Sequence, residues 1–231
     1  RTQSSLKIYN TITKGKTAFQ PLRPDEILIH SCGPTVHEVP HIGNYRRFII
    51  SDLIRRYLEY QGFRVRHVMN IIDLDDRSIR GAEQAGVDLA TYTEKGANAF
   101  LEGLCTLNLR PDNEYPRASG HFEEMVKLVE KLVQKGYAYE KLRSVYFDIS
   151  KLADYGCLSN VDLQKGEPGR TVDQDNYEKD SPADFTLLKR STLSELKRGF
   201  YYKTRWGNVR PSWHQECPAI AMKYLGERFD I

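Results

Sequence analysis

The chain has 231 residues, of which 34 are lysine or arginine and 31 are aspartate or glutamate, leaving a net charge of +3. This balance excludes a polybasic nucleic-acid binder and an acidic tail protein, and 40% hydrophobic residues exclude a mainly disordered chain. No apolar run approaches the roughly 20 residues that a membrane span needs, and the first five residues lack the apolar core of a signal peptide.

The first third of the chain predicts a strand, a helix and a second strand. Residues 26–31 form a short apolar run that predicts a buried strand, which ends in a turn over residues 32–35. A helical pattern follows over about 43–61, and residues 64–72 are rich in β-branched side chains. Strand, helix and strand within about 45 residues indicate a βαβ unit, and therefore an α/β fold with a parallel sheet.

The remainder predicts helices, short strands and one long polar segment. Residues 159–183 are polar and predict a loop or an inserted segment, because loops of this length are uncommon inside a compact domain. Phe229, Asp230 and Ile231 resemble the opening of another strand. The other predicted elements are helices at about 76–85, 91–107 and 121–135, a hairpin at 137–148, sheet at 199–205 and a helix at about 217–225.

A turn and a helix start predict a phosphate-binding edge. Cys32-Gly33-Pro34-Thr35 follows the first strand, and His41-Ile42-Gly43-Asn44 opens the helix. Ligands of open parallel sheets bind beyond the carboxyl ends of the strands, where the free N–H groups of a helix start attract phosphate. The alternative is an ordinary strand-to-helix turn with an incidental histidine.

Two further clusters carry possible chemistry. Asp73, Asp75 and Asp76 end the second strand, where they bind a metal or, more simply, cap a helix. Trp213, expected to be buried, precedes Cys217 at the start of a helix, which favours a thiolate. If Cys32 and Cys217 point into one cleft, they supply two soft ligands for Zn²⁺; the alternative is two buried thiols. Without a Cys-x-x-Cys pair, reduced thiols in the cytoplasm are expected.

These stretches together resemble the cysteinyl-tRNA synthetase family. The match includes Cys-Gly-Pro-Thr-Val, then His-Ile-Gly-Asn nine residues after the cysteine, then Asn-Ile-x-Asp-x-Asp-Asp. It extends in the family's order from about Leu6 to Ile231 through Arg110-Pro111-Asp112, Pro116-Arg117-Ala118, Tyr155-Gly156-x-Leu158-Ser159, Asp184-Phe185 and Arg210-Pro211-x-Trp213-His214-x-Glu216-Cys217.

The resemblance implies a Rossmann-like class I synthetase catalytic domain with a parallel sheet, split by an inserted connective segment. Residues 6–110 would be its first half and residues 111–205 the connective insertion. Residues 206–231 would be the truncated start of the second half, so the chain is expected to be C-terminally incomplete.

The resemblance also implies the reaction and its site. ATP, with magnesium, would activate cysteine to cysteinyl-adenylate for transfer to tRNA(Cys), in a monomeric cytoplasmic enzyme that does not contact membranes. One zinc ion would hold the thiolate of substrate cysteine and reject serine. The implied site residues are Cys32 and Cys217 for zinc, His41 and Asn44 for catalysis, His41, Gly43 and Asn44 for ATP, and Gly33, Thr35 and Trp213 for cysteine.

The chain also departs from the family pattern. His37 replaces a tyrosine, and Ile72 replaces a threonine of the cysteine-binding region. The second zinc-ligand pair, the phosphate-gripping loop and the tRNA-binding domain are not in this sequence, so the isolated chain is expected to bind zinc weakly and not to charge tRNA. Two alternatives are a ligase that joins cysteine to an amino sugar, of mycothiol type, and a catalytically inactive synthetase-like paralogue that binds a partner.

Overall fold

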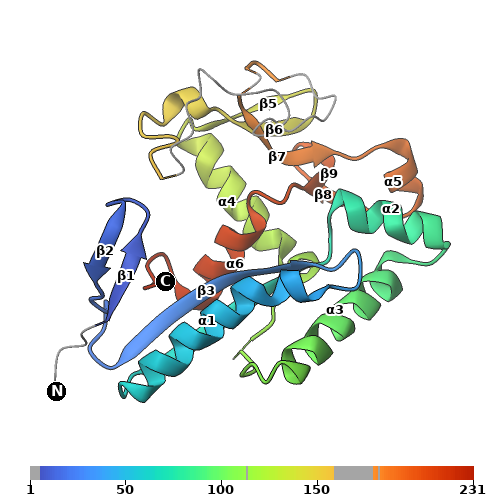
Figure 1. Cartoon of the computed structure of the whole chain (residues 1–231). Coiled ribbons are helices and arrows are strands. Elements are labelled where there is room, and N and C mark those ends of the chain that lie inside the picture. The colour runs from blue at the N-terminus through green and yellow to red at the C-terminus, as the bar shows by residue number, and fades with distance from the viewer. Residues whose placement is uncertain (1–5, 113, 159–178, 182) are drawn as a thin grey trace. The chain divides into compact units, whose positions relative to one another are not determined.

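The computed structural model describes residues 6–112, 114–158, 179–181 and 183–231. The chain divides into two units, which we name after the pairing of their main strands. The parallel unit comprises Gln20–Glu124 and Glu216–Ile231, and the antiparallel unit comprises Arg1–Phe19 and Met125–Gln215 (Figure 1). No helix among the described residues is long and apolar enough to cross a membrane.

The centre of the parallel unit is the βαβ arrangement that the sequence predicts. Strands β3 (Glu26–Thr35) and β4 (Arg64–Ile72) pair in parallel, and helix α1 (Ile42–Tyr60) connects them. Strand β3 is longer than predicted, because the expected turn over residues 32–35 continues the strand after a shift in register. Gly33 permits this close pairing, since a Cβ atom there would lie 1.6 Å from the carbonyl oxygen of Asn70.

Two short segments extend this sheet at its edges. Beside β4, the backbone N–H groups of Met69 and Ile71 donate to the carbonyls of Glu114 and Pro116. Beside β3, the N–H of His30 donates to the backbone carbonyl of Ile231, and the N–H of Ile231 donates to the backbone carbonyl of Leu28. The predicted opening of a strand at residues 229–231 is therefore realised as hydrogen bonding along β3, although no regular strand is formed there.

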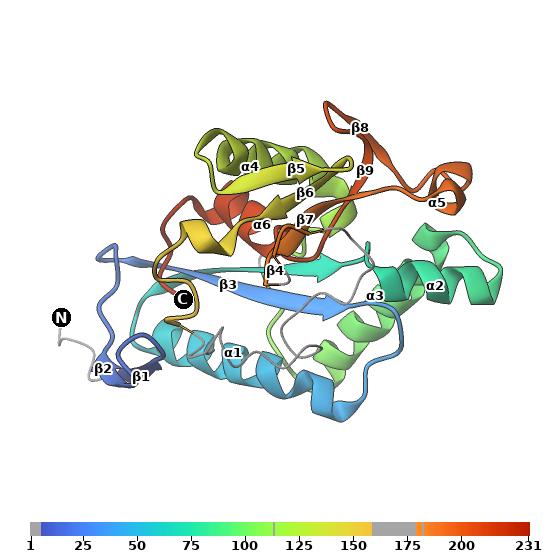
Figure 2. The ribbon, with the colours of Figure 1, turned by 90° about the horizontal axis from the view of Figure 1, so that it is seen from above.

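Helices cover both faces of the β3–β4 sheet (Figure 2). Helix α6 (Glu216–Leu225) packs on one face, where Leu225 contacts Leu28 and Val68. The opposite face packs on α1 and α3 (Leu89–Thr106), where Phe48 and Phe100 meet Met69. Helix α2 (Asp76–Ala85) packs beside α3 and has the predicted bounds.

A buried chain of polar groups lies on the α1 side of the sheet. The His67 ring is 1% exposed, with Nε2 at 2.8 Å from Ser31 Oγ and Nδ1 at 2.7 Å from Asp112 Oδ1. The His67 ring thereby links Ser31 of β3 to Asp112 in the segment beside β4. Arg55 donates to the Pro111 carbonyl at 2.7 Å, which fastens the same segment to α1.

The antiparallel unit contains two sheets of short strands. Strands β1 (Lys7–Asn10) and β2 (Gly15–Ala18) form a hairpin that the sequence analysis did not predict. The second sheet has the order β5-β6-β7-β9-β8, and all its pairs are antiparallel. Its strands are β5 (Ala138–Lys141), β6 (Ser144–Phe147), β7 (Phe185–Arg190), β8 (Tyr202–Thr204) and β9 (Gly207–Pro211).

Three helical segments complete the description. Helix α4 (Phe122–Gln134) follows the 3-10 turn Ala118–His121 and continues from one unit into the other. Helix α5 (Leu193–Lys197) and strand β7 were not predicted, whereas the hairpin of β5 and β6 was. Most of the predicted polar loop at 159–183 lies outside the described residues.

Candidate functional site

Two cysteines from distant parts of the sequence meet at one end of the sheet. Cys32 lies near the end of β3, and Cys217 is the second residue of α6. Their sulfurs are 2.7 Å apart, with the Cys217 thiol donating to Cys32. The predicted meeting of the two sulfurs is confirmed, and it arises because α6 packs on the face of the sheet to which Cys32 points.

The pKa values of the two thiols are shifted in opposite directions. The Cys217 thiol donates to Cys32, and this bond, followed by the nearby Arg47 guanidinium, lowers the pKa of Cys32 to about 7 against the opposing effect of burial. The pKa of Cys217 is raised, first because it is the donor to Cys32 and second because it is buried. The side chain of Asn70 also faces this pair, with Oδ1 at 3.5 Å from the Cys217 sulfur. Of the two sulfurs, Cys32 therefore gives up its proton more readily.

The pair fits half of a zinc site. Cysteine sulfur is a preferred zinc ligand, and two sulfurs on one tetrahedral zinc lie about 3.5–4 Å apart, so the present contact would widen by about 1 Å. Within the described ranges, no group of three or more His, Cys, Asp or Glu side chains is placed to hold a metal ion. The chain thus offers two of the three or four protein ligands that zinc sites contain.

A carboxyl group without a partner lies next to this pair. Glu216 is fully buried, and neither of its oxygens has a hydrogen-bond partner among the described residues. Burial first, and then the charges of Asp75, Asp73 and Cys32, raise its pKa well above the usual range. The sequence analysis did not select Glu216, because a glutamate at a helix start is ordinarily a solvated residue.

His41 and Asn44 form the cap of helix α1. The Nδ1 atom of His41 accepts the N–H of Gly43 at 3.1 Å, and Oδ1 of Asn44 accepts the N–H of His41 at 2.8 Å. A Cβ atom on residue 43 would approach the His41 ring to 2.9 Å, so Gly43 lets the ring fold over the helix start. This cap fixes His41 and Asn44 at the positive end of the helix dipole, where an anion is stabilised.

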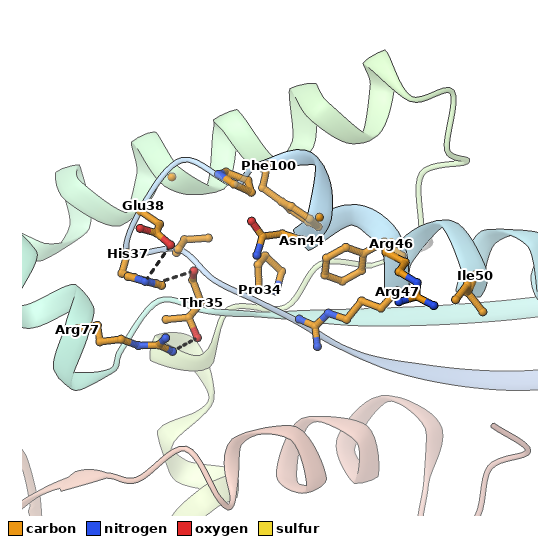
Figure 3. Close-up of a pocket in the computed structure, with 15 residues that line it drawn as sticks. Pro34, Thr35, His37, Glu38, Asn44, Arg46, Arg47, Ile50, Arg77 and Phe100 are labelled. Carbon is orange, nitrogen blue, oxygen red and sulfur yellow. Dashed lines mark hydrogen bonds and ion pairs between the residues drawn. The ribbon is translucent and has the colours of Figure 1, made fainter. Parts of the chain in front are cut away.

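A pocket of about 590 Å³ lies in the parallel unit beside this helix start. Of the residues implied by the resemblance, Thr35, Gly43 and Asn44 line it, whereas His41 does not. Figure 3 shows Arg77 directed at Thr35, and its Nη2 atom donates to Thr35 Oγ1 at 3.1 Å while its Nε atom donates to Asp75 at 3.1 Å.

Three arginines give this pocket a cationic character that the sequence analysis missed. Arg46 and Arg47 from α1 line it together with Arg77 from α2, and Phe100 from α3 adds an apolar wall. Arg47 also donates to the carbonyl of Gly33 at 2.8 Å. The available sequence signal was the pair of arginines that follows the His-Ile-Gly-Asn stretch after Tyr45. The resulting wall suits a phosphorylated ligand.

The two departures from the family pattern occupy defined positions. His37 also lines the pocket, with Nδ1 at 3.1 Å from the carbonyl oxygen of Thr35 and Nε2 at 3.5 Å from Glu38. Ile72 is buried at the end of β4, opposite Thr35 in the register. An apolar side chain therefore stands beside one of the residues that the resemblance assigns to cysteine.

Trp213 differs from the sequence expectation of a buried aromatic. It belongs to the antiparallel unit, is 61% exposed and stacks on His214 with ring centroids 3.9 Å apart. His214 takes the inner position, 4.5 Å from the ring of Phe185. Burial, followed by the charges of Lys189 and Lys179, lowers the pKa of His214 to about 4. The Trp213 ring is thus free to meet a ligand on its outer face.

Comparison with known proteins gives consistent results over nearly the whole chain. A family model described as the tRNA synthetases class I (C) catalytic domain matches residues 18–231. A cysteine--tRNA ligase of Methanosarcina mazei is 46% identical over 226 residues, which cover 98% of this chain and 48% of the ligase. The corresponding ligase of Pyrococcus horikoshii is 43% identical over 227 residues, covering 98% of this chain and 47% of the ligase.

A solved structure of Mycobacterium tuberculosis methionyl-tRNA synthetase with methionyl-adenylate is also similar. Its TM-score is 0.48 at 19% identity, over 55% of this chain and 25% of that protein. The chain spans about half the length of the curated relatives it matches.

Proposed function

Since the chain belongs to the family of class I (C) tRNA synthetase catalytic domains, we propose that it acts in the activation of cysteine by ATP and in the transfer of cysteine to tRNA(Cys). The observation that carries this proposal is the contact between the sulfurs of Cys32 and Cys217 at the end of the parallel sheet. A thiol pair at the ligand-binding edge is suited to select a sulfur-containing amino acid. The names of the relatives agree with this substrate.

The proposed reaction has two steps. A carboxylate oxygen of cysteine attacks the α-phosphorus of ATP, and pyrophosphate leaves; a ribose hydroxyl of tRNA then attacks the carbonyl carbon, and AMP leaves. His41, Gly43 and Asn44 hold ATP at the start of α1, where the positive end of the helix dipole and the outer nitrogen of His41 stabilise negative charge that develops in the first step. The arginines of the pocket hold further phosphate groups by charge-assisted hydrogen bonds.

Cysteine selection is assigned to a second group of residues. Cys32 and Cys217 would hold one zinc ion, which when bound supplies a soft Lewis acid that prefers the thiolate of cysteine to the hydroxyl of serine. The backbone of Gly33, the hydroxyl of Thr35 and the ring of Trp213 are proposed to position the amino acid. Magnesium enters with ATP as part of the substrate.

The domain assignment is also a proposal. Residues 6–110 are the first half of the catalytic domain, residues 111–205 the connective insertion and residues 206–231 the start of the second half. Strands β5 to β8 of the antiparallel sheet lie within the proposed insertion, whereas β9 (Gly207–Pro211) pairs with β7 and β8 although it follows residue 205. We further propose a monomer that works in the cytoplasm, where its four free cysteines remain reduced.

Cysteine-dependent exchange between ATP and pyrophosphate tests the activation step. The full gene product that carries this chain should exchange with cysteine, and Cys32→Ser and Cys217→Ser should abolish the exchange without unfolding the protein. Cys105→Ser and Cys157→Ser are the matched controls, because these two thiols are exposed and no contact joins either to the pair. Exchange that survives in Cys32→Ser would contradict the assigned role.

The choice of acceptor separates this proposal from its two rivals. Charging of tRNA(Cys) supports the ligase, and transfer to an amino sugar in place of tRNA would identify a mycothiol-type ligase. Absence of exchange, with folded protein and bound nucleotide, would identify an inactive paralogue, which the apolar Ile72 beside Thr35 favours. The isolated 231-residue chain is expected to bind zinc weakly and not to charge tRNA.

A further inference from the structure

The contact between Cys32 and Cys217 has a second chemical consequence. The two sulfurs are 2.7 Å apart, and a disulfide needs about 2.05 Å, so only a small side-chain movement separates the thiols from a covalent bond. Cys32 is exposed and Cys217 is half-buried, so a soluble oxidant reaches Cys32 first.

The surrounding structure keeps the two sulfurs together. Packing of Leu225 on Leu28 and Val68 fixes α6 against β3, and Oδ1 of Asn70 lies 3.5 Å from the Cys217 sulfur. Both cysteines belong to the parallel unit, so their approach does not depend on how the two units are arranged. The other two cysteines, Cys105 and Cys157, are exposed thiols without such a neighbour.

We propose that Cys32 and Cys217 are a redox modification site, at which a low-molecular-weight disulfide such as oxidised glutathione converts the two thiols reversibly into an intramolecular disulfide. Disulfide formation itself is independent of the proposed aminoacylation. Its regulatory meaning rests on the proposed function, because a disulfide removes both sulfurs from zinc and would switch cysteine selection off.

The proposed oxidation proceeds by two exchanges. Cys32 loses its proton, and its sulfur attacks one sulfur of the oxidant, which breaks the oxidant's S–S bond and releases one thiol. Cys217 then loses its proton, and its sulfur attacks Cys32 Sγ, which releases the second thiol. In sum, the protein dithiol is oxidised to a disulfide and one molecule of the oxidant is reduced to two thiols.

Intact mass and peptide mapping of the 231-residue chain test this site. After reduction and desalting, the chain is equilibrated with mixtures of reduced and oxidised glutathione. The expected product has lost two hydrogens and yields one cross-linked peptide pair containing Cys32 and Cys217. A Cys105→Ser/Cys157→Ser variant should give the same product, whereas Cys32→Ser and Cys217→Ser should not form it.

The contrary results are equally specific. A glutathione adduct that persists on Cys32 without a cross-link, or cross-links involving Cys105 or Cys157 in its place, would overturn the proposal. Circular dichroism of each variant shows whether it is folded. If a single variant fails to fold, the cross-link in the Cys105→Ser/Cys157→Ser chain still decides the outcome.

The same oxidation experiment with added zinc separates this inference from the proposed function. If zinc uses the same sulfurs, saturating zinc should slow disulfide formation about tenfold or more, because bound sulfur is not free to attack. Titration of free thiols follows disulfide formation, and a coloured zinc chelator follows zinc binding. Neither measurement requires an assay of enzyme activity. A disulfide that forms at the same rate with zinc would support the redox site and contradict the zinc assignment.

Discussion

In the antiparallel unit the buried carboxylate of Glu195 has two partners, whereas in the parallel unit the buried carboxyl of Glu216 has none among the described residues. Glu195 accepts the N–H of Thr192 at 2.7 Å and pairs with Arg210 Nε at 2.6 Å. Glu216 is as deeply buried but is left with like charges and the thiol pair nearby. A paired buried carboxylate holds a fold together, while an unpaired one costs stability and marks a place where a ligand or another group acts.

The largest expected effect comes from breaking the pair in the antiparallel unit. Glu195→Gln removes the carboxylate that pairs with the buried Arg210 guanidinium at 2.6 Å, which should lower the free energy of unfolding by about 3–5 kcal/mol. Urea titration followed by circular dichroism measures this loss.

The same substitution in the parallel unit is the matched control. Glu216→Gln removes an ionisable carboxyl whose pKa burial raises well above the usual range, so the free energy of unfolding should not fall and is expected to rise at neutral pH. Equal losses in the two variants would show that the contrast between the units has no energetic basis.

The next largest effect concerns the close pairing of β3 and β4. Gly33→Ala places a Cβ atom 1.6 Å from the Asn70 carbonyl oxygen, so the strands must separate locally. We expect a loss of about 3 kcal/mol in unfolding free energy and a wider spacing of the Cys32 and Cys217 sulfurs. Gly120→Ala, where an added Cβ atom would meet nothing within 4 Å, serves as a control for the effect of removing a glycine elsewhere in the unit. Unchanged stability and unchanged glutathione cross-linking in Gly33→Ala would contradict this geometry.

Lowering the pH should destabilise the fold through His214, whose ring is partly buried in the antiparallel unit. Its pKa of about 4 lies below the usual 6.5, so the unfolded chain takes up the proton first and stability falls as pH drops from 6.5 toward 4. Between pH 7 and pH 5 this amounts to about 2 kcal/mol. His214→Phe keeps the ring against Phe185 and should remove that part of the pH dependence in thermal or urea unfolding. An unaltered pH slope would show that the imidazole is protonated in the fold.

The smallest effect is expected at the cap of α1. His41→Ala removes the acceptor of the Gly43 N–H and should cost about 1 kcal/mol of unfolding free energy. His41→Asn restores an acceptor but lacks the imidazole, so it should recover stability without recovering adenylate formation. If His41→Asn restores both, capping alone explains the residue.

The sequence predicted the parallel unit better than the antiparallel unit, for a physical reason. The apolar residues of α1 and the β-branched residues of β4 recur over nine or more positions, which is long enough to identify a helix and a strand. The predicted strand at 64–72 has the bounds of β4. Strands β7 and β9, which were not predicted, contain six and five residues, and their pairing partners determine them more than their own composition does.

The site was predicted unevenly for the same kind of reason. The meeting of Cys32 and Cys217 came from the family resemblance, because spacing cannot show which helix packs on which face of a sheet. Arg77 was missed because a lone arginine after aspartates is typical of a solvated helix start. Trp213 was misplaced because a large apolar ring is buried more often than not, and here His214 occupies the inner position in its stead.

The packing of α6 on β3 also dictates an order of events during synthesis. Residues 20–124 leave the ribosome with the face of Leu28 and Val68 uncovered, because Leu225 lies beyond the whole of Met125–Gln215. At bacterial and eukaryotic elongation rates this apolar face stays open for about 5–20 seconds, long enough for chaperones to bind it. The parallel unit can therefore close over this face only when the antiparallel unit has been fully translated.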